Sequence, residues 1–215
     1  MFSKYLTYID RTSEVAFAVL MVIIINGYVA LSDLNTGFTY IVAVNLGACF
    51  GWGTIDGLIY AISSSIKRND IRNKLINLKS ALKTENTLQQ VKNNLDDTAF
   101  GGFDEKGKDA IAREIIAHVP DAKLEENKLL TKEEMMGWLS IIGVYMVVGF
   151  LLALPFLVID NKIAAWVVSN AFGLTWIFWY GSQLGKIAGK NRWLVGIIMA
   201  GVGILYLVLS YIVWA

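Results

Sequence analysis

Long apolar runs separated by short polar segments organise this chain. A membrane-spanning helix needs about 20 mostly apolar residues, and five runs meet that length: 15–32, 38–65, 135–159, 163–184 and 193–214. A polar stretch at 67–132 separates the second run from the third. The pattern predicts an all-α integral membrane protein with five transmembrane helices, two before and three after a small helical insert. The predicted parts are therefore 1–66, 67–132 and 133–215.

The distribution of positive charge predicts the orientation of these helices. All but one of the 19 Lys and Arg residues lie in the N-terminus, the insert or the loop between the last two runs, and only Lys162 lies on the opposite side. Cytoplasmic segments carry an excess of Lys and Arg. We therefore expect a multi-pass protein of the cytoplasmic (inner) membrane, with the N-terminus and insert in the cytoplasm and the C-terminus outside. The net charge of +1 indicates no nucleic-acid partner.

The insert shows two helical patterns. Apolar residues at 71, 75, 78 and 82 form one stripe, which 88, 91 and 95 continue after a break. Residues 96–107 contain Gly101-Gly102 and predict a loop, and a second helix is expected at 108–119. The stripes could pack on each other or against another subunit, and the pattern leaves both possibilities open.

Several residues predict how the membrane helices begin, bend and pack. Thr12 or Ser13 is expected to cap the first helix, and the segment 131–134 has the pattern of a capping box at the start of the third. Pro155 should kink the third helix because it has no N–H group. Glycines four residues apart predict faces where neighbouring helices approach closely; they are Gly47 with Gly51, Gly53 with Gly57, and the series Gly181, Gly185 and Gly189.

Asp56 is the leading functional candidate, because it is an acid inside the second apolar run. A carboxylate costs several kcal/mol in hydrocarbon, so such residues usually face a partner, an ion or a wet cavity. Asp56 is therefore expected to bind a cation or carry a proton. The alternative is a structural role, in which Asp56 hydrogen-bonds to Asn26, Asn45, Ser169 or Asn170 and holds the helices together.

Other candidates lie near the expected cytoplasmic side. Glu14 either interacts with the dipole at the start of the first helix or guards the mouth of a cation path. Two carboxylates, Glu133 and Glu134, directly precede two thioethers, Met135 and Met136, and this set could bind Mn²⁺ or Fe²⁺. A capping box followed by apolar residues also explains the pattern. His118 and Cys49 are expected to be surface or packing residues. We find no nucleophile–base pair or phosphate loop, so an enzyme is not expected.

Three segments carry a resemblance to a known family. They are RTSEVAFAVLMVIIINGYVAL, NLGACFGWGTIDGLIYAI and LPFLVIDNKIAAWVVSNAFGLTWIFWYGSQLGKIAG. Within them, the most specific motifs are Arg11-x-x-Glu14, Trp52-Gly-x-x-Asp56-Gly57 and Ser169-Asn170. The chain resembles the vacuolar iron transporter (VIT) family, in particular its small prokaryotic branch, over all five predicted helices.

The resemblance implies a homodimeric five-helix transporter that moves Fe²⁺, and often Mn²⁺, out of the cytosol in exchange for protons. It implies no tightly bound cofactor, because the metal is the transported substrate. The family has an Asp-Gly pair in its first helix, whereas this chain has Asn26-Gly27. Asn26 offers a neutral carbonyl oxygen and cannot carry a proton. The insert also lacks the dense Glu pairs of the metal-collecting members.

Two functions follow from these observations. The first is a divalent-cation transporter for iron or manganese, with Asp56 at the centre, Asn26 as a neutral ligand, and Glu14 with the 133–136 group at the inner mouth. The second is a membrane scaffold or regulatory subunit that does not transport and binds a partner through its insert. In that case, Asp56 is structural.

Overall fold

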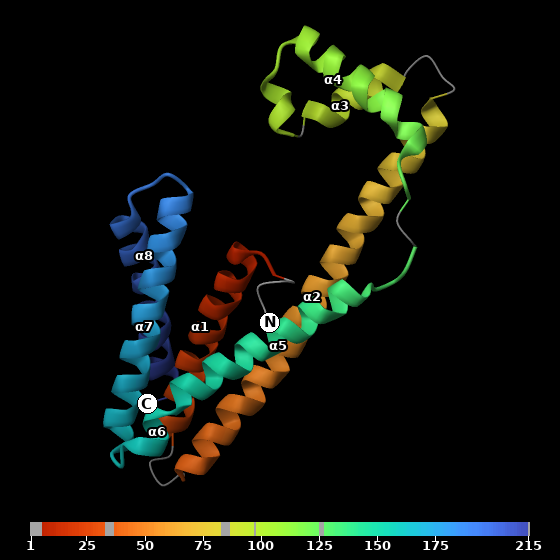
Figure 1. Ribbon diagram of the computed structural model, residues 1–215. Coiled ribbons are helices and arrows are strands. Elements are labelled where there is room, and N and C mark those ends of the chain that lie inside the picture. The colour runs from red at the N-terminus through yellow and green to blue at the C-terminus, as the bar shows by residue number, and fades with distance from the viewer. Residues whose placement is uncertain (1–5, 33–36, 83–86, 97, 125–126, 215) are drawn as a thin grey trace. The chain divides into compact units, whose positions relative to one another are not determined.

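Helices are the regular secondary structure of the described part of the chain, with no strand among its residues. A computed structural model describes residues 6–32, 37–82, 87–96, 98–124 and 127–214, leaving out the side chains of 29–32, 213 and 214. The α-helices, labelled in Figure 1 where there is room, are α1 (Tyr8–Ser32), α2 (Phe38–Ala81), α3 (Thr87–Asp96), α4 (Glu105–His118), α5 (Lys132–Ala153), α6 (Pro155–Val158), α7 (Lys162–Ile187) and α8 (Arg192–Trp214). Two short 3-10 helices, Ala99–Gly102 and Val119–Asp121, flank α4.

Four helical segments of the described chain are long and apolar enough to cross a membrane. They are α2, the α5–α6 pair (Lys132–Val158), α7 and the part of α8 from Arg192 to Ile212. The chain is therefore a membrane protein by the length and composition of its helices. The predicted first span lies in α1, which is not among the four, so the count of five spans stays a prediction.

The chain folds as two compact units. The membrane unit comprises Met1–Ala61 and Lys132–Ala215, and the insert unit comprises Ile62–Thr131. Helix α2 contributes to both, because it continues without a break from Phe38 to Ala81. The predicted insert at 67–132 lies almost wholly within the insert unit, and its cytoplasmic position stays a prediction.

Helix α1 begins earlier than expected, and a different residue caps it. The backbone N–H of Asp10 donates to Thr7 Oγ1 over 3.1 Å, and the Thr7 hydroxyl donates to the Asp10 carboxylate over 2.6 Å. The predicted caps, Thr12 and Ser13, are wrong. Both lie inside the helix and donate their hydroxyls to backbone carbonyls one turn earlier. Residues 8–14, which precede the predicted first run, are already helical, so Glu14 lies beyond the first turn of α1.

The core of the membrane unit surrounds α1, which contacts α5, α7 and α8. Small and branched side chains fill it, and the fully buried ones include Val19, Val22 and Ile23 of α1, Ile141 and Leu152 of α5, and Ile177 of α7. Helix α5 ends just before Pro155, which starts the separate helix α6, so the chain is interrupted where the kink was predicted.

Only one of the two predicted glycine pairs in α2 supports close packing. A Cβ on Gly53 would lie 3.0 Å from Cβ of Tyr145, and one on Gly57 would lie 2.8 Å from the carbonyl oxygen of Trp138. No described residue outside their own helix turn stands within 4 Å of a Cβ on Gly47 or Gly51. Close packing of α2 against α5 therefore involves the pair Gly53 and Gly57.

Helices α7 and α8 form an antiparallel hairpin whose close contact also uses glycine. A Cβ on Gly181 would lie 2.9 Å from the backbone oxygen of Val195, and one on Gly185 would lie 2.9 Å from Cα of Arg192. Gly189, predicted as the third member of this face, instead has φ +65° in the turn that follows α7. A side chain is disfavoured at that φ, so Gly189 ends the helix rather than packing it.

The insert unit has its own small core between α3, α4 and the end of α2. Val91, Leu95 and Ala112 are buried, and Leu78 and Leu88 pack against them together with isoleucines of α4. From Leu78 onward, the predicted apolar stripes therefore pack against each other within the chain. Ile71, at the start of the first stripe, is 67% exposed and does not join this core.

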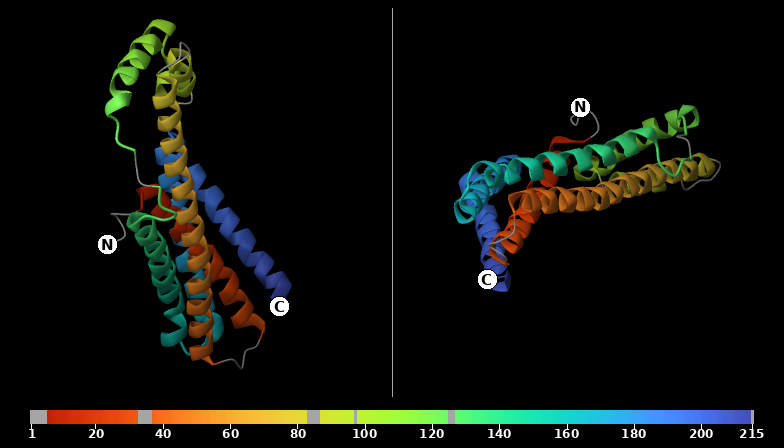
Figure 2. Two further views of the ribbon diagram at one scale, coloured as in Figure 1. Left: turned by 90° about the vertical axis from the view of Figure 1, so that its right-hand side faces the viewer. Right: turned by 90° about the horizontal axis from the view of Figure 1, so that it is seen from below.

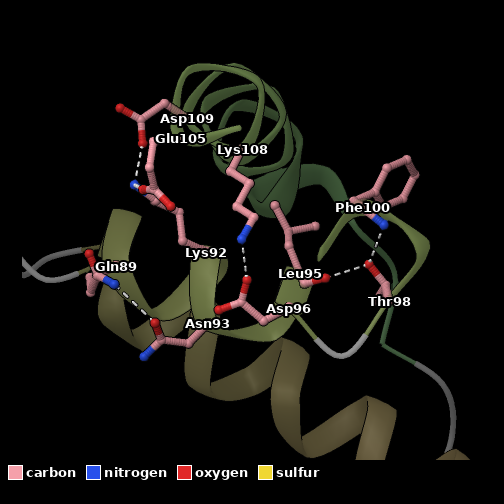
Figure 3. A network of polar contacts seen from close by, with 10 residues as sticks. All are labelled: Gln89, Lys92, Asn93, Leu95, Asp96, Thr98, Phe100, Glu105, Lys108 and Asp109. Carbon is pink, nitrogen blue, oxygen red and sulfur yellow. Dashed lines mark hydrogen bonds and ion pairs between the residues drawn. The ribbon is translucent and has the colours of Figure 1, made fainter. Parts of the chain in front are cut away.

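Ion pairs join α3 to α4 above that core (Figure 3). Lys92 Nζ lies 2.6 Å from a Glu105 carboxylate oxygen and 2.7 Å from one of Asp109, and Lys108 Nζ lies 2.6 Å from one of Asp96. The hydrogen bond that Lys92 donates to Asp109, followed by the one it donates to Glu105, raises the pKa of Lys92. The hydrogen bond from Lys92 lowers the pKa of the Asp109 carboxyl.

We expect Lys92→Met to loosen the contact between α3 and α4. Backbone amides of these helices should exchange with deuterium about two- to fivefold faster at pH 7 in the full-length protein. Lys74→Met is the matched control, because Lys74 pairs with Asp70 at an exposed site where both side chains are more than half exposed. Equal exchange in the Lys92 variant and the wild type would contradict this role.

The same contact has a predictable pH dependence. The pKa of Asp109 is lower in the folded protein than in the unfolded chain, so the pair stabilises the fold above the ordinary Asp pKa and loses this effect as pH falls through the lowered value. The pKa of Lys92 is raised, so its contribution is complete below the ordinary Lys pKa and is lost as pH rises through the raised value. The difference in exchange between wild type and Lys92→Met should therefore shrink in acid and in strong base.

Candidate functional site

Asp56 lies in the membrane unit, where α2 packs against α5. Its carboxylate is partly buried, and the hydroxyl of Tyr145 donates a hydrogen bond to its Oδ2 atom. Gly53, one turn before Asp56, brings the backbone of α2 against Tyr145, so the absence of a side chain at Gly53 makes room for this approach. The indole N–H of Trp138 also donates to the carbonyl of Thr54 over 3.0 Å, which fastens the two helices beside the acid.

A second carboxylate approaches the same place from α1. Glu14 is partly buried and lies within electrostatic range of Asp56. Tyr145 is within electrostatic range of both acids, and Tyr180 of α7 is within range of Glu14. We call Glu14, Asp56, Tyr145 and Tyr180 the acid–tyrosine cluster. Four helices thus contribute two carboxylates and two phenols to one region of the membrane unit.

The predicted amide residues form a separate group. Asn45 donates to Oδ1 of Asn26 over 2.5 Å, Asn26 donates to Oγ of Ser169 over 3.0 Å, and Ser169 donates to the carbonyl of Leu152 over 2.7 Å. Asn170, next to Ser169, donates to the carbonyl of Trp166 over 2.9 Å. We call Asn26, Asn45, Ser169 and Asn170 the amide cluster, and all four side chains are buried.

The amide cluster holds unused acceptor capacity. Oδ1 of Asn45 and Oδ1 of Asn170 are buried and accept no hydrogen bond from any described residue. A buried carbonyl oxygen without a donor costs about 1–3 kcal/mol. Each of these oxygens is therefore suited to an additional ligand with positive charge or N–H or O–H groups.

The two clusters lie at different depths of the membrane unit. Along α1, residue 14 precedes residue 26 by about 18 Å at 1.5 Å per residue, and along α2 residue 45 precedes residue 56 by about 17 Å. Val19, Val22 and Ile23 lie between the levels. The alternative prediction that Asp56 hydrogen-bonds to an amide or to Ser169 is wrong, because its observed partner is Tyr145. Asp56 and Asn26 do not meet in one ligand shell.

The 133–136 group occupies the first turns of α5. Glu134 is buried, Glu133 is exposed, Met135 is 49% exposed and Met136 is half-buried. Successive residues of a helix point in different directions, so these four side chains do not converge. They also precede Tyr145 by roughly 14–18 Å along the helix. The structure therefore keeps this group apart from the acid–tyrosine cluster.

Within the described residues, no three His, Cys, Asp or Glu side chains gather in a way that could hold a metal ion. Any cation bound at the acid–tyrosine cluster would rely on two carboxylates and on oxygen atoms from phenols, backbone or water. Such a set is weaker than a structural metal site, which usually has four protein ligands. A transport path needs binding that is weak enough for the ion to leave.

Three further polar residues, Cys49, His118 and Ser65, have packing or surface roles. Cys49 is buried where α2 faces Gly149 of α5, so it is a packing residue as expected. His118 is exposed, and its Nδ1 atom lies 3.0 Å from the carbonyl oxygen of Glu114. Ser65 donates to the carbonyl of Leu129 over 2.6 Å and holds a loop of the insert unit in place.

Sequence reasoning missed the two tyrosines of the acid–tyrosine cluster. Both stand in apolar helices, and Tyr145 is fully buried. A phenol hydroxyl buried in such a helix needs a hydrogen-bond partner, so Tyr145 could have been paired in advance with an acid of a neighbouring helix. No family model and no curated protein matches the chain. The resemblance to the VIT family therefore stays a prediction.

Proposed function

We propose that the protein carries a divalent cation, Fe²⁺ or Mn²⁺, across the cytoplasmic membrane, and that it works as a homodimer. The observation that supports this function is the pairing of Asp56 with the hydroxyl of Tyr145, with Glu14 of another helix within electrostatic range of both. Two acids placed close together inside an apolar bundle repel each other. A cation or a shared proton between them removes that repulsion.

The donor chemistry of the cluster suits the proposed ions. Carboxylate and phenol oxygens are hard ligands, and Mn²⁺ and Fe²⁺ accept them. Tyr145 donates a hydrogen bond to Asp56, and in this proposal its oxygen would turn toward a bound cation in place of that hydrogen bond. In this proposal Asp56 and Glu14 bind the cation and protons alternately. This alternation would couple cation movement to proton movement in the opposite direction.

The remaining predicted residues would extend the path on both sides. Glu133, Glu134, Met135 and Met136 would receive the cation from the cytoplasm, and the amide cluster would offer neutral oxygens at the second level. Asn45 and Asn170 each present a buried oxygen that accepts no hydrogen bond in the described chain. Asn26 would hold the side chains of the amide cluster in place through its hydrogen bonds with Asn45 and Ser169.

Flux of Fe²⁺ and of Mn²⁺ into proteoliposomes tests the proposal directly. The vesicles would contain a metal-sensitive dye and would be measured with and without a pH gradient. We expect flux above that of protein-free vesicles, with a dependence on the gradient. A folded protein that carries neither ion, under either condition, would rule out the transporter.

Tyr145→Phe probes the hydrogen bond at the centre of the cluster. The variant keeps the ring that packs against Gly53 and removes only the hydroxyl that donates to Asp56. We expect about tenfold lower flux, as for loss of a group that orients a ligand, with unchanged helix content by circular dichroism. Tyr206→Phe on α8 is the control, because Tyr206 lies outside both clusters and is 40% exposed. Normal flux in Tyr145→Phe would remove Tyr145 from the path.

The scaffold function has one observation in its favour. A polar groove of about 660 Å³ lies between α2 and α3 of the insert unit, and its lining includes Asn77, Gln90, Asn93 and Asn94. A non-transporting subunit could bind a peptide there through amide hydrogen bonds. Gln90→Ala with Asn94→Ala should then abolish partner capture while leaving any cation flux unchanged.

A further inference from the structure

A cavity of about 260 Å³ lies at the end of the α7–α8 hairpin where the two helices are joined. The sequence predicts that this end faces the cytoplasm. Its walls are aromatic and its rim is basic, with Phe178, Trp179, Ser182, Lys186, Arg192 and Trp193 among the lining residues. A cavity of this volume is smaller than the usual site for a whole drug-sized molecule. It matches a single compact head group better.

Close packing of the hairpin builds this cavity. Gly185 lets α8 approach, and the turn at Gly189 returns the chain so that the N–H of Lys190 reaches the carbonyl of Gly185 over 2.8 Å. Ser182 of α7 then donates to the carbonyl of Arg192 over 3.3 Å. These contacts bring Lys186 of α7 and Arg192 of α8 to one opening. The two helices pack against each other and lie at the blue end of the colour scale in Figure 2.

Neither α7 nor α8 contains an acidic residue that could pair with the positive charge at this opening. The chain contains no Asp or Glu from residue 161 to its last residue. Neither Lys186 nor Arg192 forms an ion pair within the described chain. Arg192 instead lies over the ring of Trp193, with its guanidinium carbon 5.1 Å from the ring centroid. Two cations thus stand at an aromatic cavity with their charge available to a ligand.

We propose that this cavity binds the phosphodiester head group of an anionic phospholipid. Lys186 and Arg192 would donate to the phosphate oxygens, since paired cations are the usual phosphate ligands. Trp179, Trp193 and Phe178 would contact the glycerol and the start of the acyl chains. A free phosphate ion would leave these aromatic walls unused, whereas a lipid occupies both parts of the cavity. The inference needs α7 and α8 to lie in a membrane, and it does not depend on transport.

Fluorescence quenching by brominated lipids tests this site in the full-length protein. Tryptophans 179 and 193 line the cavity, so brominated phosphatidylglycerol should quench emission more than brominated phosphatidylcholine at equal mole fraction. The double variant Lys186→Gln/Arg192→Gln should lower the relative affinity for the anionic lipid by at least about tenfold. Inorganic phosphate at millimolar concentration should not compete.

Lys190→Gln is the matched control, because Lys190 is exposed in the same turn but does not line the cavity. It removes a neighbouring charge and should change the relative affinity little. An equal effect of Lys190→Gln would mean diffuse attraction to the bilayer and would overturn the site. Full competition by inorganic phosphate would overturn the lipid as its occupant. If the double variant misfolds, the wild type still decides, since equal quenching by the two lipids refutes the proposal.

Discussion

The Asp56→Asn variant should transport Fe²⁺ and Mn²⁺ at less than about a tenth of the wild-type rate. Even groups that only orient metal ligands are worth 10- to 100-fold, and this change removes the charge of the proposed central ligand itself. Asn is nearly isosteric with Asp and can still accept the hydrogen bond from Tyr145. The helix packing around position 56 is therefore expected to survive, and the loss of flux should come from the lost charge.

The measurement compares initial flux per folded protein for wild type and variant in the same lipid. Size-exclusion profile and helix content establish folding. Asp160→Asn serves as the control, because Asp160 lies between α6 and α7, outside both clusters. Normal flux in Asp56→Asn would refute the assignment of Asp56. Reduced folded yield with unchanged flux per folded molecule would instead support the structural role.

Proton coupling can be read from the same preparations. If Asp56 exchanges a cation for a proton, the residual flux of Asp56→Asn should lose its dependence on the pH gradient. Glu14 would still be present in that variant. A remaining gradient dependence would therefore assign the proton to Glu14 rather than to Asp56.

Gly57→Ala should destabilise the membrane unit by about 1–3 kcal/mol, the usual cost of overpacking a tight contact. A Cβ at this position would lie 2.8 Å from the carbonyl oxygen of Trp138. A backbone oxygen cannot move aside as a flexible side chain can, so α2 and α5 would have to separate. Their separation would also stretch the contact between Tyr145 and Asp56.

Gly51→Ala is the matched control for this substitution. It lies in the same helix, and a Cβ there would have no neighbouring atom of the described chain within 4 Å. Ala is favoured over Gly in a helix by about 0.8–1.0 kcal/mol, so Gly51→Ala should be neutral or stabilising. The midpoint of thermal unfolding in detergent measures both variants. Equal midpoints would show that α2 and α5 do not require glycine at their contact.

Patterns of apolar residues were sufficient to predict most helices. The last three membrane runs correspond to α5 with α6, α7 and α8, because a long apolar segment has few alternatives to a helix in a membrane. Pro155 marked the interruption of the third run for an equally local reason, its missing N–H group. Single-residue features of this kind depend on the chain itself and need no knowledge of neighbours.

Features that depend on neighbours were predicted less well. Four glycines in α2 share a spacing, but among the described residues only Gly53 and Gly57 closely approach another helix, because α5 packs against that part of the face. Gly189 has the spacing of a packing residue and instead forms a turn, since α7 ends before it. Spacing along a helix identifies a face, and it does not identify what the face meets.

The sequence alone was enough to single out Asp56, because an acid within an apolar run is expensive wherever the helix lies. Its partner was decided by the tertiary structure. Tyr145 is 89 residues away, and it reaches Asp56 because the glycines of α2 admit α5. The tertiary structure also separates Asn26 from Asp56. Because α1 and α2 run in opposite directions, Glu14 early in α1 lies at the level of Asp56, and Asn26 late in α1 lies at the level of Asn45. Composition and residue spacing do not indicate which residues of different helices lie side by side.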